Sequence, residues 1–431
     1  MTKGMVKNFT ELAVTPNRKI ALEIMEAGLS AINTEKAVNS SVSLVENTLF
    51  VRGKSFNLTK FRNIKIVGFG KSSSQAASAL EKILGPRIRE GAVIGLSKAD
   101  CKYIETFSGT HPEPSKMNIP AGKRIYEIVD NSRADDLIIV IVSGGGSSLL
   151  CSSENECIQE RSLYEASLKS KETIIELNTV RKHIRSLKGG DLAKLAYPAT
   201  VIGLIFSDVP GDHYEDVASG PTYKDTTTIA DAEKIITENN LGKFDLIETP
   251  KEDRYFENVH NFVLVSNEIA VEAMAAKAKE FNLKVNVVST ALYNEINEAL
   301  EKIFRGRTSK NSQRSDLWEV VLAAGEPGVE IKDKAGKGGR NLHMGLEAIK
   351  MKLIDENSVF ISFASDGMDN SDVAGAIVDK NTIEKAKKFN LDAGDYLEKF
   401  DSYDFFQKTG DMIMTGPTGS NVSDLMILLT K

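Results

Sequence analysis

The sequence predicts an α/β protein in which parallel sheets are covered by helices. Short apolar runs rich in β-branched residues alternate with longer amphipathic stretches, as expected of strands joined by crossover helices. The chain has 431 residues, and a single hydrophobic core rarely supports a chain of that length. Its length therefore favours two domains. Several apolar runs end in polar loops that contain glycine, at the position where open α/β sheets bind their ligands.

The predicted strands and helices alternate along both halves of the chain. In the first half we expect strands over residues 64–68, 92–96, 137–142 and 201–206. Helices are expected there over residues 20–33, 73–84, 121–131, 171–187 and 230–239. Further strands are expected over residues 262–265, 285–288, 319–323 and 359–363.

A charged, turn-prone stretch between Leu241 and Asn258 interrupts this alternation and predicts the domain connection. We therefore expect one domain over residues 1–245 and a second over residues 255–431. The polar stretch 305–316 is either a second linker or an exposed loop.

Composition argues against several classes of partner. The net charge of -6 gives no bulk attraction to nucleic acid or to anionic lipid. No apolar run approaches the roughly 20 residues of a membrane span, and the polar N-terminus lacks a signal-peptide core, so we expect a cytoplasmic protein without a membrane partner. The cysteines form no CxxC pair and the histidines lack zinc spacing, which argues against a disulfide framework and a structural zinc site.

The most informative segment is LIIVIVSGGGSSLL, which begins at Leu137. Its buried strand opens into a loop, here named the glycine loop, made of Ser143, Gly144, Gly145, Gly146, Ser147 and Ser148. Bare backbone amides in such a turn can converge on a phosphate. The alternative is a tight strand-to-helix turn that binds nothing.

Lys71 begins a helix directly after a strand, where its charge and the helix amides can hold an anion; the alternative is a solvated surface lysine. The segment is not a P-loop, because that motif would require glycine at the position of Lys65.

Ser207 and Asp208 follow another strand, and a carboxylate there can take a substrate proton, hold magnesium or merely cap a turn. Lys188, beside two glycines, is a further ligand candidate, although most such charges lie on a solvated face.

In the second half, a loop flanked by two short predicted strands leads to Arg340 and Asn341 at the start of a helix. There the guanidinium and the helix amides can grip one anion, and the loop itself is a hairpin tip or a lid. Glu326 follows a strand and can bind a hydroxyl or metal, or stabilise the turn. Asp366 also follows a buried strand, and its hard oxygens suit magnesium. Residues 415–421 form either a hairpin turn or a donor-rich wall of a cleft.

Taken in order, these segments closely resemble the class II glycerate 2-kinases, the family with a C-terminal MOFRL domain. The resemblance covers nearly the whole chain and is carried by GKSSSQAASAL, THPEP, SGGGSSLL, RKHIRSLKGGDLA, SDVPGDHYEDVASGPT, GEPGVEI, GKGGRN, SDGMDNSDVAGAIVD and TGPTGSNVSDL. This sequence departs from the family at AAGEP (usually GGET), GGRNLH (GGRNQE) and SDGMDNSD (TDGTDGPTD). The second departure places Leu342 and His343 where the family has a polar and an acidic residue.

The resemblance implies ATP-dependent phosphorylation of D-glycerate, at the 2-hydroxyl, to give 2-phosphoglycerate. It also implies a Rossmann-like three-layer α/β/α N-terminal domain, a C-terminal α/β domain with a mixed sheet and a MOFRL region near residues 315–425, and an active site in the cleft between them. By position, Lys71 and Arg340 match the family's basic active-site residues.

Phosphoryl transfer needs positioning and positive charge more than a covalent nucleophile. We expect the glycine loop, Ser207 and Lys188 to bind phosphates, and Lys71, Arg340, Glu326 and Asn341 to bind substrate. Asp208 or Asp366 orients the attacking hydroxyl, and the same two carboxylates are candidates for Mg²⁺. The expected partners are ATP, Mg²⁺ and D-glycerate, for a monomer or homodimer.

Two other functions compete with this one. An NAD(P)H-dependent hydroxypyruvate reductase would need a dinucleotide fingerprint with an acidic residue about 20 positions later, which no strand here supplies. A non-catalytic sensor of nucleotides or small acids would bind without turnover. The gathering of Lys, Arg and Asp at several strand ends favours an enzyme.

Overall fold

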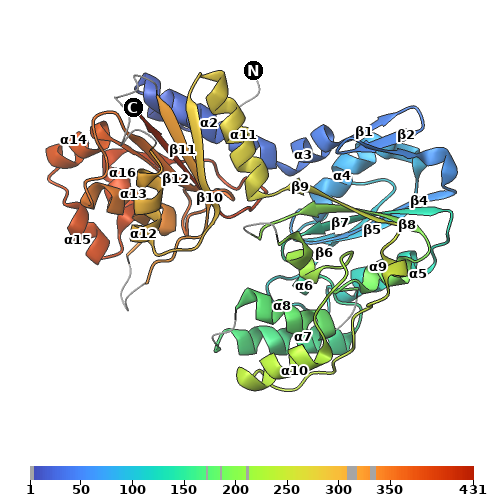
Figure 1. The fold of residues 1–431 in the computed structure, drawn as a ribbon. Helices are drawn as coiled ribbons and strands as arrows, with labels where there is room; N and C mark the ends of the chain where they lie inside the picture. Colours follow the sequence, from blue (N-terminus) through green and yellow to red (C-terminus); the bar gives the residue numbers. More distant parts are fainter. Residues whose placement is uncertain (1–3, 171–172, 185–186, 210–212, 308–317, 331–335) are drawn as a thin grey trace. The chain divides into compact units, whose positions relative to one another are not determined.

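The structure is a computed structural model that describes residues 4–170, 173–184, 187–209, 213–307, 318–330 and 336–431. It divides into two compact units (Figure 1). The middle unit is Thr34–Leu264, and the terminal unit joins Met1–Asn33 to Val265–Lys431. Each unit is built on its own six-stranded sheet. The predicted α/β class is confirmed in both.

The sheet of the middle unit has the strand order β6-β5-β4-β7-β8-β9. Its strands are β4 (Asn63–Phe69), β5 (Ile88–Gly95), β6 (Glu105–Ser108), β7 (Asp136–Ser143), β8 (Thr200–Phe206) and β9 (Val259–Val265). The pairs from β6 through β8 are all parallel. Every residue of β7 is buried, because a central parallel strand is covered on both faces.

The helices of the middle unit are α3 (Thr34–Ser41), α4 (Ser73–Leu84), α5 (Ile119–Asp130), α6 (Gly146–Leu149), α7 (Glu154–Ser167), α8 (Ile174–Ile184), α9 (Asp191–Ala196) and α10 (Ile229–Glu238). Short 3₁₀ turns occur at Leu58–Lys60, Gly85–Arg87, Tyr214–Ser219 and Asp253–Tyr255. Helices α7, α8 and α10 share a small apolar cluster of their own. The ends of the predicted helix 171–187, at 171–172 and 185–186, lie outside the described residues.

A small antiparallel sheet in the middle unit was not predicted. It consists of β1 (Val42–Val45), β2 (Thr48–Val51) and β3 (Lys54–Asn57). Each strand has four residues, too few to show a clear hydrophobic period in the sequence.

The sheet of the terminal unit is mixed and has the order β10-β11-β15-β12-β13-β14. Its strands are β10 (Lys284–Leu292), β11 (Glu319–Gly325), β12 (Val359–Ala364), β13 (Gly375–Asp379), β14 (Met412–Ile413) and β15 (Asp424–Thr430). Strands β10 and β11 pair in parallel and the other neighbours pair antiparallel, so the mixed sheet implied by the family resemblance is confirmed. Strands β14 and β15 lie apart in this order, so residues 415–421 are a crossover and the hairpin alternative is wrong.

The helices of the terminal unit are α1 (Phe9–Leu12), α2 (Pro16–Ile32), α11 (Asn267–Glu280), α12 (Ile296–Arg305), α13 (Arg340–Lys350), α14 (Lys380–Lys388), α15 (Ala393–Glu398) and α16 (Ser402–Thr409). Helices α12, α13 and α16 pack on one face of the sheet through a core that includes Phe360 and Phe406. Helices α2 and α11 pack against each other and contact the same sheet. No helix among the described residues has both the length and the apolarity to cross a membrane.

The predicted domain limits need correction, because the first 33 residues belong with the second half of the chain. Arg18 of α2 is 1% exposed and forms ion pairs with Asp379 at 2.7 Å and Asp411 at 2.8 Å. These partners lie more than 360 residues away, so no local pattern reveals them. The predicted connection 241–258 lies inside the middle unit, since β9 extends that unit's sheet before the true boundary after Leu264.

One local prediction in the second half also changes. Strand β11 precedes the loop after Gly325 as expected, but the next element among the described residues is helix α13, and residues 326–330 and 336–339 contain no second strand. The intervening residues 331–335 lie outside the described part of the chain, together with 308–317 of the predicted polar interruption.

Candidate active site

The glycine loop forms a tight turn between β7, which ends at Ser143, and α6, which begins at Gly146. Gly145 has a φ of 74°, in the left-handed region that favours glycine. A Cβ atom on Gly145 would also lie 2.8 Å from the ring of His111 and 3.1 Å from Cε of Lys71. The loop therefore needs glycine here both for its backbone conformation and for the close approach of two basic side chains.

Lys71 and Asp208 both adjoin this loop. The backbone N–H of Lys71 donates to the carbonyl of Gly144 at 2.9 Å. A Cβ on Gly144 would overlap the carboxylate of Asp208, so that carboxylate sits directly against the loop. The reason is topological, because β4, β7 and β8 are adjacent parallel strands whose carboxyl ends meet at one edge. The structure thus brings together three predicted features, here named the middle site: Lys71, the glycine loop and Asp208.

His111 is a member of this neighbourhood that the sequence interpretation did not single out. Burial, and then the positive charges of Lys71 and Arg181, lower the pKa of His111 to about 4. Its imidazole is therefore neutral at pH 7, and the positive charge nearby comes from Lys71 and Arg181. The sequence analysis used the segment THPEP only as part of the family resemblance. Its histidine could have marked the segment as a candidate for the site.

The hydroxyls of the middle site are partly committed to the fold. Ser143 accepts the backbone N–H of Ser72 at 3.1 Å, and the hydroxyls of Ser147 and Ser219 lie 2.8 Å apart. Ser207 is buried and bonds within its own turn, to Val209. In this conformation, the groups most available to an anion are accordingly the lysine and the loop backbone.

Lys188 does not lie on a solvated face. Its side chain is fully buried, and its ammonium lies 2.5 Å from Glu160, which also pairs with Arg181 at 3.5 Å. Burial opposes the charge, but the carboxylates of Glu160 and Glu156 keep the pKa of Lys188 above its ordinary value. The ammonium of Lys188 is therefore buried and paired with Glu160. In this structure it is not exposed for the contact with a phosphate that we predicted.

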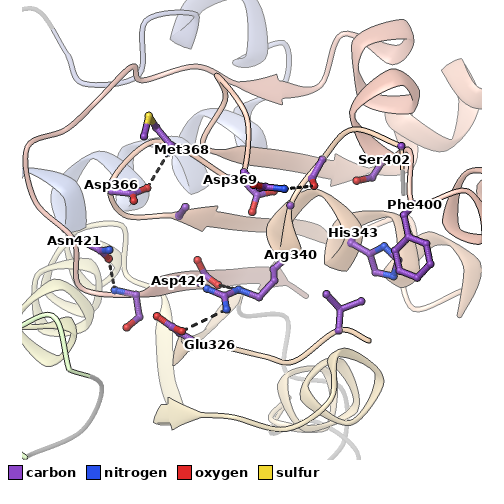
Figure 2. A pocket seen from close by; sticks show the side chains of 17 residues that line it. Glu326, Arg340, His343, Asp366, Met368, Asp369, Phe400, Ser402, Asn421 and Asp424 are labelled. Atoms are coloured by element: carbon purple, nitrogen blue, oxygen red, sulfur yellow. Dashed lines mark hydrogen bonds and ion pairs between the residues drawn. The ribbon is translucent and has the colours of Figure 1, made fainter. Parts of the chain in front are cut away.

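The terminal unit contains a second candidate region, a cavity of about 400 Å³ here named the terminal cavity (Figure 2). Glu326 follows β11, Asp366 follows β12, and Asp424 begins β15. Because β15 runs antiparallel to both neighbours, Asp424 is opposite Gly325 on one side and Ala364 on the other. The sheet therefore delivers these three carboxylates, with Arg340 from α13, to one edge.

Arg340 is held by two of those carboxylates. Its Nε donates to Asp424 at 2.9 Å, and its Nη1 lies 3.4 Å from Glu326 (Figure 2). Asp424 is almost completely buried, and this burial, opposed by Arg340, raises its pKa to about 7. The sequence interpretation missed Asp424, although an aspartate directly before a buried apolar strand was a usable signal. The guanidinium that we predicted to bind an anion thus already forms ion pairs with Asp424 and Glu326.

The N-terminus of α13 is already satisfied by Asp369. This buried carboxylate accepts the backbone N–H groups of Asn341 at 3.0 Å and Leu342 at 2.8 Å. The side-chain amide of Asn341 bonds to Asp369, Asp424 and Ser362. The prediction that these helix amides and Asn341 bind substrate therefore needs correction, since the structure uses them to fix the helix that carries Arg340.

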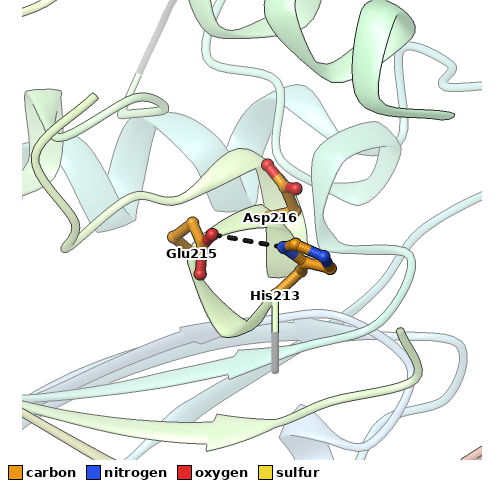
Figure 3. A group of neighbouring side chains, drawn as sticks. All are labelled: His213, Glu215 and Asp216. Atoms are coloured by element: carbon orange, nitrogen blue, oxygen red, sulfur yellow. Dashed lines mark ion pairs between the residues drawn. The ribbon is translucent and has the colours of Figure 1, made fainter. Parts of the chain in front are cut away.

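A cluster of potential metal ligands lies in the middle unit. Across the described residues, one set of three side chains lies close enough to hold an ion: His213, Glu215 and Asp216 (Figure 3). His213 and Glu215 are exposed and 3.5 Å apart, while Asp216 pairs with Lys182 at 3.0 Å. The lysine already neutralises one ligand, which disfavours a cation. Neither Asp208 nor Asp366 joins such a set within the described chain, and their binding of magnesium stays a prediction.

Two sequence families match this chain. Residues 20–250 match the family described as "Domain of unknown function (DUF4147)", and residues 319–424 match the MOFRL family. A glycerate 2-kinase of Pyrococcus horikoshii is 34% identical over 96% of this chain and 97% of its own. A D-glycerate 2-kinase of Thermotoga maritima is 32% identical over 95% and 97%. An Agrobacterium vitis protein with the provisional name of hydroxypyruvate reductase is 34% identical over 84% and 86%.

Two solved structures share the fold. The crystal structure of a glycerate kinase from Thermotoga maritima has a TM-score of 0.83 and 31% identity, covering 96% of this chain and 99% of that one. A crystal structure from Pyrococcus horikoshii OT3 gives the same score and identity over 96% and 98%. The likeness extends over both units.

Proposed function

This chain belongs to the glycerate 2-kinase family with DUF4147 and MOFRL regions, and from that premise we propose that it phosphorylates D-glycerate with ATP. The product of the proposed reaction is 2-phosphoglycerate, with release of ADP. The observation that carries the proposal is the middle site, where Lys71, the glycine loop and Asp208 meet at the carboxyl edge of a parallel sheet. A cation, open backbone amides and a carboxylate are the groups that phosphoryl transfer uses.

In this proposal the 2-hydroxyl oxygen attacks the γ-phosphorus, and the bond from that phosphorus to the ADP oxygen breaks. The hydroxyl proton passes to a carboxylate, for which Asp208 and Asp366 are the candidates. Lys71 or Arg340 offsets the negative charge of the glycerate carboxylate or of the transferring group. The glycine loop holds phosphate oxygens through its backbone amides.

Magnesium fits the same proposal through the chemistry of its donors. Asp208 and Asp366 offer hard oxygens, and Mg²⁺ commonly keeps several waters while binding one or two carboxylates plus substrate phosphates. When bound, the ion would neutralise phosphate charge. Asp366 uses one carboxylate oxygen to accept the N–H of Met368 at 2.9 Å, which fixes its orientation at the cavity (Figure 2).

The direct test measures product and regiochemistry together. The protein is incubated with D-glycerate, ATP and MgCl₂; ADP release is followed in a coupled assay, and ³¹P NMR identifies the phosphorylated carbon. We expect ADP and 2-phosphoglycerate. Absence of glycerate-dependent ADP release would reject the proposal, and a 3-phosphoglycerate signal would reject its regiochemistry. A parallel reaction with hydroxypyruvate and NADH should leave the absorbance of NADH unchanged, because no strand carries a dinucleotide fingerprint.

A further inference from the structure

The terminal cavity has an aromatic side that the proposed chemistry does not use. The rings of His343 and Phe400 are stacked, with centroids 5.4 Å apart and planes inclined by 17°. Both rings line the cavity beside Arg340 (Figure 2). A cavity of about 400 Å³ also falls within the range of sites for molecules larger than a three-carbon acid.

Phe400 occupies a backbone conformation that costs a non-glycine residue free energy. Phe400 follows α15 with a φ of 51°, a conformation that favours glycine. The next helix, α16, ends in the same way with Gly410 at a φ of 72°. Phe400 is only partly buried, so core packing does not explain why a bulky side chain occupies the strained position.

His343 is suited to stacking and not to binding an anion. Burial, with a smaller contribution from Lys350, lowers the pKa of its imidazole to about 4, so the ring is neutral at pH 7. Its neighbour Leu342 is fully buried in the hydrophobic core. Of the two positions where GGRNLH departs from the family pattern, His343 is therefore the one that alters the cavity wall.

The charge of the cavity selects among the parts of a nucleotide. Among the described residues that line it, the carboxyl groups of Glu326, Asp366, Asp369 and Asp424 outnumber the cation Arg340. This acidic lining repels a polyphosphate, but its carboxyl oxygens can accept hydrogen bonds from amino and hydroxyl groups of a neutral nucleoside. Aromatic rings stack on any base, because every base has a π-face.

We propose that the terminal cavity binds the purine nucleoside of the phosphoryl donor, with the base stacked on the Phe400–His343 pair and the carboxylates accepting its N–H and O–H groups. This inference rests on the proposed function only for the identity of the donor as a nucleotide.

The test measures binding directly by calorimetry, with adenosine and ADP as probes. Phe400→Gly removes the ring and relieves the strained φ, so its thermal midpoint should be equal to or above that of the wild type. Both probes should bind this variant about tenfold more weakly. The matched control is Phe389→Gly, which removes a half-exposed phenylalanine from the end of α14, outside the cavity, and should leave both affinities unchanged.

Unchanged affinity for both probes in Phe400→Gly would overturn the inference, as would a rise in the KM of glycerate alone. If that variant fails to fold, His343→Ala gives the same test from the other ring. Failure of the proposed function is separately visible. A wild type that binds adenosine in a Phe400-dependent way but releases no ADP with glycerate would retain the nucleoside site and reject the kinase activity.

Discussion

The middle site and the terminal cavity occupy equivalent places in their sheets but differ in the balance of their charged groups. In the middle site, Lys71 and the carboxylate of Asp208 adjoin the glycine loop, and the charge of Arg181 acts on the neighbouring His111. In the terminal cavity four acidic residues lie around Arg340, and one of them, Asp369, already accepts the backbone N–H groups of Asn341 and Leu342. The edge of an α/β sheet thus provides the position of a site, while long-range side-chain partners decide which charge it accepts.

The largest expected effect comes from removing the cation of the middle site. Lys71→Ala should lower kcat/KM for glycerate phosphorylation by roughly 10³-fold, because transition-state charge loses a positioned cation. Steady-state kinetics check this, with Lys98→Ala as the control at an exposed lysine. Equal kinetics for the two variants would show that Lys71 has no role in the mechanism. The middle site would then lack the catalytic cation that distinguishes it from the terminal cavity.

The close packing of the glycine loop predicts a second, smaller loss. Gly144→Ala would place a methyl group against the carboxylate of Asp208, so loop or carboxylate must move. We expect kcat/KM to fall by about 10²-fold, on the scale of an ångström-sized misplacement. The loss should be much smaller when measured in an Asp208→Ala background. Full additivity in that double-mutant cycle would contradict the contact between these residues.

The terminal cavity predicts an unusual dependence of stability on pH. Asp424 has a pKa of about 7 in the folded chain against an ordinary value of 3.8, so folding favours its protonated form. Its contribution is greatest below about pH 4 and is lost as pH rises through 7. Asp424→Asn should therefore gain stability relative to wild type as pH increases, by up to ~4 kcal/mol.

Urea unfolding of both proteins at intervals from pH 4 to pH 8 measures this difference. Parallel stability curves for wild type and Asp424→Asn would show that the carboxylate titrates normally. Burial and the acidic lining of the terminal cavity would then not raise the pKa of Asp424.

The smallest expected effect is a change in one titration. Because the charge of Lys71 contributes, after burial, to the low pKa of His111, Lys71→Ala should move that pKa part of the way back toward 6.5. Two-dimensional NMR of the histidine side chains follows the titration in both proteins, and His260 serves as the internal reference. An unmoved His111 would mean that burial alone sets its pKa.

Much of the middle site was predictable because its parts are local. The buried strand before Ser143, the glycines and the lysine after β4 are each visible in a short window, and parallel strands bring their carboxyl ends to one edge. Lys188 was the exception. Its neighbouring glycines resemble a loop, but Glu160, from a helix 28 residues earlier, holds it in the interior.

The terminal cavity was less predictable because its partners are distant in the chain. Arg340 bonds to a carboxylate 84 residues away, and that carboxylate reaches it only because β15 inserts between β11 and β12. Asp369 likewise takes the amides of α13 from 28 residues away. The N-terminal helix was misplaced for the same reason, since Arg18 finds its carboxylates at Asp379 and Asp411.

The sequence by itself determined the α/β class, the ends of most central strands and the loops that follow them, because hydrophobic period and glycine chemistry act over a few residues. Only the tertiary structure decided which of those polar groups remain available to a ligand. The physical reason is that burial and Coulomb interactions depend on neighbours in space. Lys71 was left beside open backbone, whereas Lys188 and Asn341 were bound into the fold.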